Sequence, residues 1–98
     1  MPKIAAKKEE EQPLSFGPVT TGWLKAIGVL TVKDIKDRGA IAVFRALVEQ
    51  RFNPSVVMIY VLEGAILDIH WNQIPKERQE ELKREATAIK LAQQLLQR

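Results

Sequence analysis

The feature that most constrains the fold is a nearly continuous apolar stretch in the middle of the 98-residue chain. Between Val56 and Leu67, Glu63 is the one charged residue. A helix that is apolar on all sides is buried on most of them. The β-branched residues at the start of the stretch would also suit a strand, but its length and the absence of a partner strand favour a helix. We therefore predict a helix over residues 54–69 that forms the core of an all-α domain.

The sequence around this helix suggests how it begins and what lies against it. Asn53 is a good N-cap and Pro54 a good first helical residue. Gly64 lowers the intrinsic helicity by ~1 kcal/mol relative to alanine, so we expect it to allow the close approach of another helix. Glu63 is expected to mark a narrow exposed strip.

Residues 17–35 predict two short helices joined by a tight bend. Pro18 suits the first helical position, where its missing N–H costs nothing. Gly28 stands where a left-handed C-terminal cap is expected. Thr31, with Asp34 three residues later, resembles the capping box that starts a helix. This pair of helices is expected to form the front edge of the domain.

Two more helices complete a predicted five-helix domain. Gly39 separates the second helix from a third, over residues 40–51, which has apolar residues at helical spacing. After a turn in which Trp71 is expected to plug the end of the core, Pro75 starts a long last helix that reaches about residue 97.

The last helix is long for a domain of this size. At 1.5 Å per residue its ~23 residues span ~35 Å, more than the ~26 Å diameter implied by a ~13 Å radius of gyration. We expect its end to project and to bury apolar side chains against a partner protein or a second copy. Alternatively, the helix folds back along the domain or its end frays. The residues expected to make this contact are Ala88, Leu91, Ala92, Leu95 and Leu96.

Composition narrows the classes of protein that fit. The chain has no cysteine, which excludes disulfides, thiolate zinc sites and cysteine nucleophiles. Its longest apolar run, residues 56–62, is far shorter than the ~20 residues of a spanning helix. Residues 1–13 are polar and charged, and we predict a disordered tail there. A single domain over residues 14–98, in the cytoplasm and with no membrane contact, is the expected organisation.

The sequence holds no convincing catalytic or metal site. His70 is the only histidine, and a general base would also need an orienting group and a nucleophile. Ser15 and Ser55 are the only serines, and both stand near predicted helix starts, where capping explains them. Asp68 is close to His70, but no second ligand has metal-binding spacing. We expect no enzyme activity and no cofactor.

Several short motifs, in order, resemble a known family. They are Gly17-Pro18, Trp23-Leu24, Ile27-Gly28-Val29, Thr31, Asp34-Ile35, Gly39-Ala40, Tyr60, Leu62-Glu63-Gly64-Ala65, His70-Trp71-Asn72 and Pro75. Together they resemble the C-terminal domain of the TfoX/Sxy family of bacterial competence regulators, over about residues 14–82. The resemblance implies a small all-helical fold related to helix-hairpin-helix domains, here as a stand-alone module. It also implies a non-enzymatic regulatory or protein-interaction role. Residues 83–98 extend the last helix beyond the usual domain end.

Nucleic-acid binding by the helical hairpin is the alternative function. Helix-hairpin-helix proteins present backbone N–H groups to a phosphate from a Gly-x-Gly turn. Val19 occupies the place of the second glycine, and it disfavours a positive φ. The net charge of +3 is spread along the chain without a strongly basic block. The candidate contacts are Gly17, Lys25, Lys33, Lys36 and Arg38.

Overall fold

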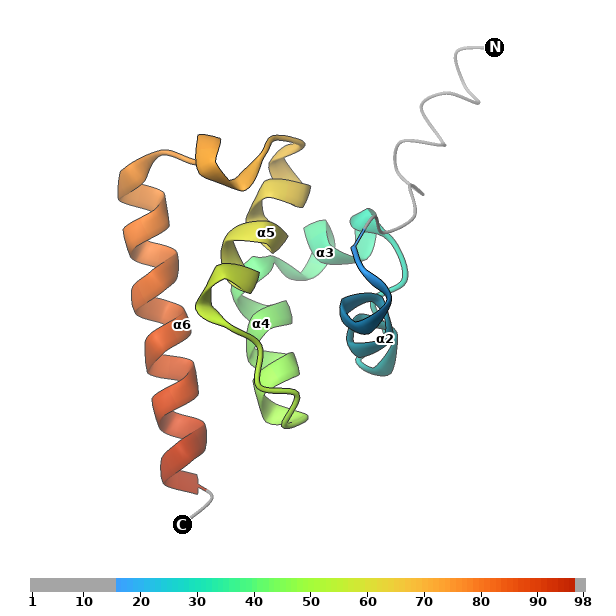
Figure 1. Ribbon diagram of the computed structural model, residues 1–98, viewed down its shortest axis with the longest axis vertical. Helices are drawn as coiled ribbons and strands as arrows, with labels where there is room; N and C mark the ends of the chain where they lie inside the picture. Colours follow the sequence, from blue (N-terminus) through green and yellow to red (C-terminus); the bar gives the residue numbers. More distant parts are fainter. Residues whose placement is uncertain (1–15, 97–98) are drawn as a thin grey trace.

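The computed structural model describes residues 16–96, which form five α-helices and one short 3-10 turn (Figure 1). The elements are α2 (Pro18–Ala26), α3 (Val32–Arg38), α4 (Ala40–Glu49), α5 (Val56–Leu67), η1 (Trp71–Gln73) and α6 (Lys76–Leu96). The prediction of an all-α domain with five helices and a long last helix is therefore confirmed for this part of the chain. The predicted tail, residues 1–13, lies outside the described residues.

Helices α4 and α5 lie at the centre of the domain, with α6 along one side and the α2–α3 hairpin on the other (Figure 1). Helix α4 packs against α3, α5 and α6, and α5 also contacts α3, η1 and α6. Every one of the five helices contributes to a single core. Its buried residues are Leu24, Val29, Ile35, Ala40, Val43, Phe44, Leu47, Val48, Ile59, Leu62, Leu82, Ala86 and Ile89.

The bend between α2 and α3 has the predicted chemistry. At the end of α2, the Gly28 N–H donates to the Lys25 carbonyl over 3.0 Å and the Val29 N–H to the Leu24 carbonyl over 2.8 Å. This is the Schellman arrangement, whose central residue is left-handed. Gly28 has φ of 83°, a value that costs glycine little. The expected left-handed cap is confirmed.

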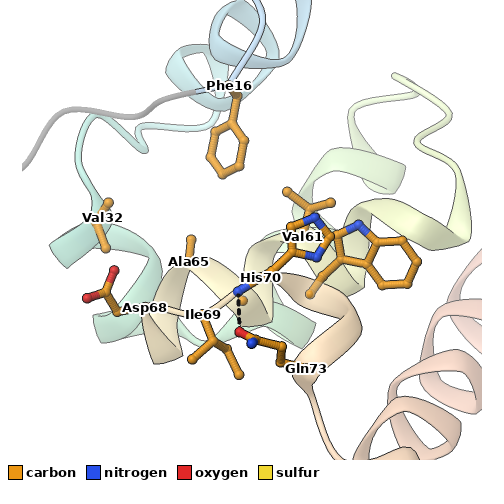
Figure 2. Close-up of a pocket in the computed structure, with 10 residues that line it drawn as sticks. Phe16, Val32, Val61, Ala65, Asp68, Ile69, His70 and Gln73 are labelled. Atoms are coloured by element: carbon orange, nitrogen blue, oxygen red, sulfur yellow. Dashed lines mark hydrogen bonds between the residues drawn. The ribbon is translucent and has the colours of Figure 1, made fainter.

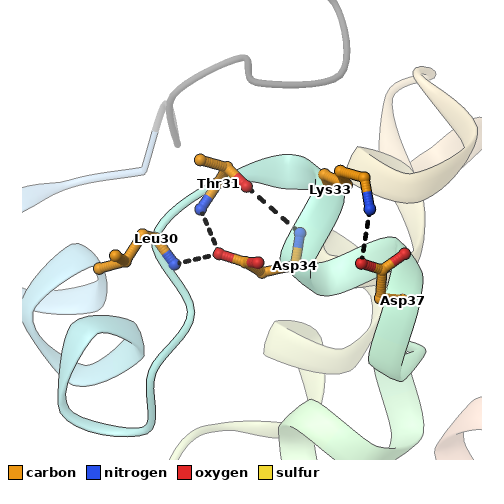
Figure 3. A network of polar contacts seen from close by, with 5 residues as sticks. All are labelled: Leu30, Thr31, Lys33, Asp34 and Asp37. Atoms are coloured by element: carbon orange, nitrogen blue, oxygen red, sulfur yellow. Dashed lines mark hydrogen bonds and ion pairs between the residues drawn. The ribbon is translucent and has the colours of Figure 1, made fainter.

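The start of α3 is a capping box, also as predicted (Figure 3). The Asp34 N–H donates to Thr31 Oγ1 over 3.3 Å, and Asp34 Oδ2 accepts from the Thr31 N–H over 3.1 Å. The same carboxylate oxygen accepts from the Leu30 N–H over 2.8 Å. The Leu30 bond, together with the bonds from Thr31, holds the pKa of Asp34 below its ordinary value, against an opposing effect of desolvation.

Helix α4 ends earlier than predicted, at Glu49 rather than Arg51. The Arg51 N–H donates to the Val48 carbonyl over 2.9 Å, and the Phe52 N–H donates to the Leu47 carbonyl over 3.1 Å. These two bonds form a second Schellman motif. Arg51 is left-handed there, with φ of 66°, so the helix cannot continue through it.

Helix α5 begins later than predicted. Asn53 is not its N-cap, since it has φ of 59°, and Ser55 holds the N-cap position without a side-chain capping bond. Pro54 is fully buried ahead of the helix instead of forming its first turn. The first helical residue is therefore Val56.

The expectation that Glu63 marks an exposed strip is wrong. Glu63 is 7% exposed, and its Oε2 lies 2.9 Å from the Nε of Arg78 on α6. A second bond of 3.4 Å joins Arg78 Nη2 to Glu63 Oε1, so the contact is two-pronged. The positive charge of Arg78 on α6 compensates the burial of the Glu63 carboxylate.

Gly64 does allow a close approach, but the approaching chain is not another helix. A Cβ at Gly64 would lie 2.8 Å from the Ile69 carbonyl oxygen and 3.3 Å from the backbone of Trp71. The connection that follows α5 turns back over this glycine. Trp71 is half-buried and stacks on Tyr60 with ring centroids 5.7 Å apart, so it covers the edge of the core rather than plugging it.

Helix α6 is tied to the domain along its inner face. Leu82, Ala86 and Ile89 are buried there, and Lys90 Nζ donates to the Pro54 carbonyl over 2.7 Å. Beyond Lys90, the leucines of the helix are exposed. In the described part of the chain, no helix combines the length and apolarity needed to cross a membrane.

Candidate functional site

The predicted contact residues of α6 form one exposed surface, which we call the C-terminal apolar face: Ala88, Leu91, Ala92, Leu95 and Leu96. Leu91 is 56% exposed, Leu95 61% and Leu96 79%. At 100° per residue the five positions span an arc of about 140°. Leu91 lies opposite the buried side of the helix, so no other element of the described chain can cover it.

Part of this face borders a shallow groove between α4 and α6. Ala88, Ala92 and Leu96 line it from α6, and Val48 lines it from α4. Its volume is about 260 Å³. Leu91 and Leu95 lie outside the groove. The C-terminal apolar face therefore has one part that lines the groove and another part that faces away from it.

Charged residues of both signs line the same groove, and they were not among the residues predicted from the sequence. They are Arg45 and Glu49 of α4 and Glu85 of α6. A search for charges flanking the apolar positions of α6 would have found Glu85. The two α4 residues become neighbours of this face only when α4 packs against α6.

The predicted nucleic-acid contacts do not form a single cluster of available charge. Arg38 Nη1 donates to the Ile27 carbonyl over 2.7 Å and its Nη2 to the Gly28 carbonyl over 3.4 Å, so its guanidinium closes the α2–α3 bend. Lys33 Nζ lies 2.9 Å from Asp37 Oδ2. The other three candidates, Gly17, Lys25 and Lys36, are exposed.

A larger open pocket lies where the end of α5, the start of α3 and η1 meet (Figure 2). Its volume is about 650 Å³, within the range of small-molecule sites. Phe16 and Val61 contribute apolar walls, while Asp68, His70 and Gln73 bring polar groups to the rim. This pocket was not predicted from the sequence, because Phe16 and Val61 are far apart in the chain.

His70 has a structural task beside this pocket. Its Nδ1 accepts from the Asn72 N–H over 3.2 Å. Its backbone N–H donates to Gln73 Oε1 over 3.2 Å, the bond drawn as a dashed line in Figure 2. These bonds cap η1. Ser55 stands at the start of α5, whereas the backbone at Trp71 lies against Gly64, nine residues or ~14 Å further along the helix. Ser55 and His70 are therefore too far apart to act as nucleophile and base.

The fold defines a small all-helical domain that opens with a capped helical hairpin and closes with a long helix. Residues 15–86 match the family model of the TfoX C-terminal domain, and the chain belongs to that family. The family is a regulatory type of domain and not a known enzyme family. Neither the curated proteins nor the solved structures yielded a match.

The match agrees with the predicted resemblance in its start and runs four residues further along α6 than Leu82. Residues 87–98 lie beyond it, and they include the whole C-terminal apolar face. The predicted division of the domain at residue 83 and the relationship to helix-hairpin-helix folds stay predictions.

Proposed function

We propose that this protein is a non-enzymatic regulatory module of the bacterial cytoplasm that acts by protein contact through α6. The observation that carries the proposal is the exposure of three leucines, Leu91, Leu95 and Leu96, within six residues. Exposed apolar side chains that adjoin one another are typical of interaction surfaces. Membership of the TfoX C-terminal domain family supports a setting in competence regulation.

The partner that fits this surface best is a second copy of the chain. Arg84, Ala88, Leu91 and Leu95 follow one another at spacings of four, three and four, which is the spacing of a coiled-coil seam. This seam lies opposite Leu82 and Ala86, so two domains can sit on the outer sides of a helix pair without collision. A pair of α6 helices would then pack leucine against leucine.

The size of the surface indicates weak association. Three partly exposed leucines on each copy bury well under the roughly 1,200 Å² at which standard stable interfaces begin. The small groove beside Ala92 adds some area. We expect a dimer that forms at high protein concentration and dissociates on dilution.

Light scattering over a wide concentration range tests the proposal. The wild-type mass should rise toward twice the monomer value at hundreds of micromolar. The double variant L91E/L95E should stay monomeric, since it places charge in the seam. V19E is the matched control, because Val19 is also exposed, at 65%, but lies on α2. A wild-type protein that is monomeric at every concentration, or association that survives in L91E/L95E, would overturn the proposal.

Nucleic-acid binding through the hairpin has less support. Two of its four basic candidates, Lys33 and Arg38, are engaged with groups of their own hairpin. Lys25 and Lys36 would have to carry the phosphate contacts. Protein contact therefore remains the function that the geometry supports best.

A further inference from the structure

A polar pocket lies between the α4–α5 connection and the last turns of α6. Its volume is about 340 Å³. It is lined by Val48, Arg51, Asn53, Lys90, Gln93 and Gln94. Both charges in this lining are positive, and the three carboxamides can donate N–H bonds. Among the described residues no carboxylate lines it. Glu49, the acid nearest to Arg51 in sequence, lines the neighbouring groove.

Arg51 occupies a position where glycine is the ordinary residue. Helices α2 and α4 end in the same pair of Schellman bonds, with Gly28 at the left-handed position of one and Arg51 at that of the other. A left-handed residue with a Cβ is strained. The backbone therefore does not explain why an arginine stands here. A cation near the C-terminus of α4 does complement the helix dipole, which is the structural alternative.

The two cations retain donors for a ligand. Lys90 Nζ uses one of its three N–H groups on the Pro54 carbonyl, at 2.7 Å. The guanidinium of Arg51 makes no hydrogen bond or ion pair within residues 16–96. Guanidinium groups bind phosphate through two parallel N–H bonds, and an ammonium adds a point charge.

We propose that this pocket binds a phosphate group, with Arg51 and Lys90 as its charged ligands and Asn53, Gln93 and Gln94 as amide donors. The phosphate belongs either to a small phosphomonoester or to a nucleic-acid strand. The pocket shares no residue with the C-terminal apolar face or with the α2–α3 hairpin, and it meets the groove beside that face at Val48 and Gln93.

The test is a titration of the ¹⁵N-labelled full chain followed by amide chemical shifts. Inorganic phosphate is added against sodium chloride of equal ionic strength. Amide signals of residues 51, 53, 93 and 94 should move saturably with phosphate and not with chloride. Phenyl phosphate and a short DNA duplex form two further arms. Tighter binding of phenyl phosphate than of the duplex identifies a small ligand, and the reverse identifies a strand.

Three variants separate a ligand role for Arg51 from a structural one. R51G places the ordinary residue in the Schellman motif, so its unfolding temperature should equal or exceed that of the wild type. Its phosphate affinity should nevertheless fall about tenfold or more. K90Q should weaken binding similarly. R45Q is the matched control, because it removes the same charge from an exposed position of α4 outside the pocket.

Three results would overturn the proposal. The first is a set of shifts that are linear in phosphate or equal with chloride. The second is an R51G protein that binds phosphate as tightly as the wild type. The third is equal weakening by R45Q and R51G, which would mean that net charge alone governs the effect. If R51G lowers the unfolding temperature and leaves the phosphate affinity unchanged, the role of Arg51 is to stabilise the C-terminus of α4 through the helix dipole.

Discussion

The guanidinium of Arg78 reaches from the first turn of α6 to Glu63, a buried carboxylate in the middle of α5, with Nε and Oε2 2.9 Å apart. Arg78 Nη1 also lies 2.7 Å from Glu81 Oε1. The bond to Glu63 and then the bond to Glu81 raise the pKa of Arg78 above its ordinary value. The pair thus joins α5 and α6 through a charged hydrogen-bonded contact.

Removing one partner of the Glu63–Arg78 ion pair should destabilise the fold more than removing both. R78M leaves Glu63 buried without a cation and should cost about 2–3 kcal/mol, at the low end for such pairs because Arg78 is partly exposed. E63M/R78M should recover most of that loss, since two apolar side chains then meet. Urea unfolding of the wild type, both single variants and the double variant measures the coupling.

K83M is the control for this cycle. Lys83 is an exposed residue of the same helix outside the proposed dimer seam, so its replacement should change the free energy of unfolding by less than about 0.5 kcal/mol. Equal effects of R78M and K83M, or additive effects of E63M and R78M, would contradict the importance of the pair.

Two glycines within helices should respond to alanine in opposite directions. G64A puts a Cβ 2.8 Å from the Ile69 carbonyl oxygen, which is backbone and cannot swing aside, and should cost about 1–3 kcal/mol. G22A meets no atom within 4 Å in the middle of α2 and should stabilise by about 0.5–1 kcal/mol. Thermal unfolding of the two proteins checks this prediction. Stabilisation by G64A would show that the backbone at Ile69 can move away from an added Cβ at little cost.

The capping box of α3 should depend on pH. The pKa of Asp34 is lowered on folding, so its carboxylate stabilises the protein above the unfolded pKa of about 3.9 and stops doing so as pH falls through the lower folded value. NMR titration of the Asp34 carboxyl group should give a midpoint below 3.8. A midpoint at or above that value would mean that the two N–H bonds from Leu30 and Thr31 do not favour the charged form of Asp34.

The threonine of the same box offers a stability test. T31A removes the oxygen that accepts from the Asp34 N–H and should cost about 1 kcal/mol. T87A, at an exposed position inside α6, should be neutral or slightly stabilising. If chemical unfolding finds the two variants alike, the cap contributes little to the fold.

Duplex retardation at low salt tests the hairpin alternative. If the hairpin binds DNA, K25Q and K36Q should each weaken binding and reduce its salt dependence. K83Q is the control, because it removes one charge from an exposed position of α6. Absence of retardation by the wild type at low salt, or equal weakening by all three variants, would remove the hairpin from consideration.

Local chemistry made much of the fold predictable. Pro18, Gly28 and the Thr31–Asp34 box act on backbone groups within a few residues, so their effects could be read from the sequence and are confirmed. The apolar residues of α5 likewise predicted a central helix. The C-terminal apolar face was predictable as a set of residues, because a helix fixes which positions share a side.

Only the tertiary structure decided the details that depend on distant partners. Glu63 is buried because Arg78, fifteen residues later, reaches it, and Gly64 is needed because the chain returns over it at Ile69. The polar pocket at Arg51 requires Lys90 from another helix. The sequence by itself determined where the helices lie and which sides are apolar, since those follow from short-range periodicity and capping. Packing decided which polar groups meet, because that depends on how the helices are placed in space.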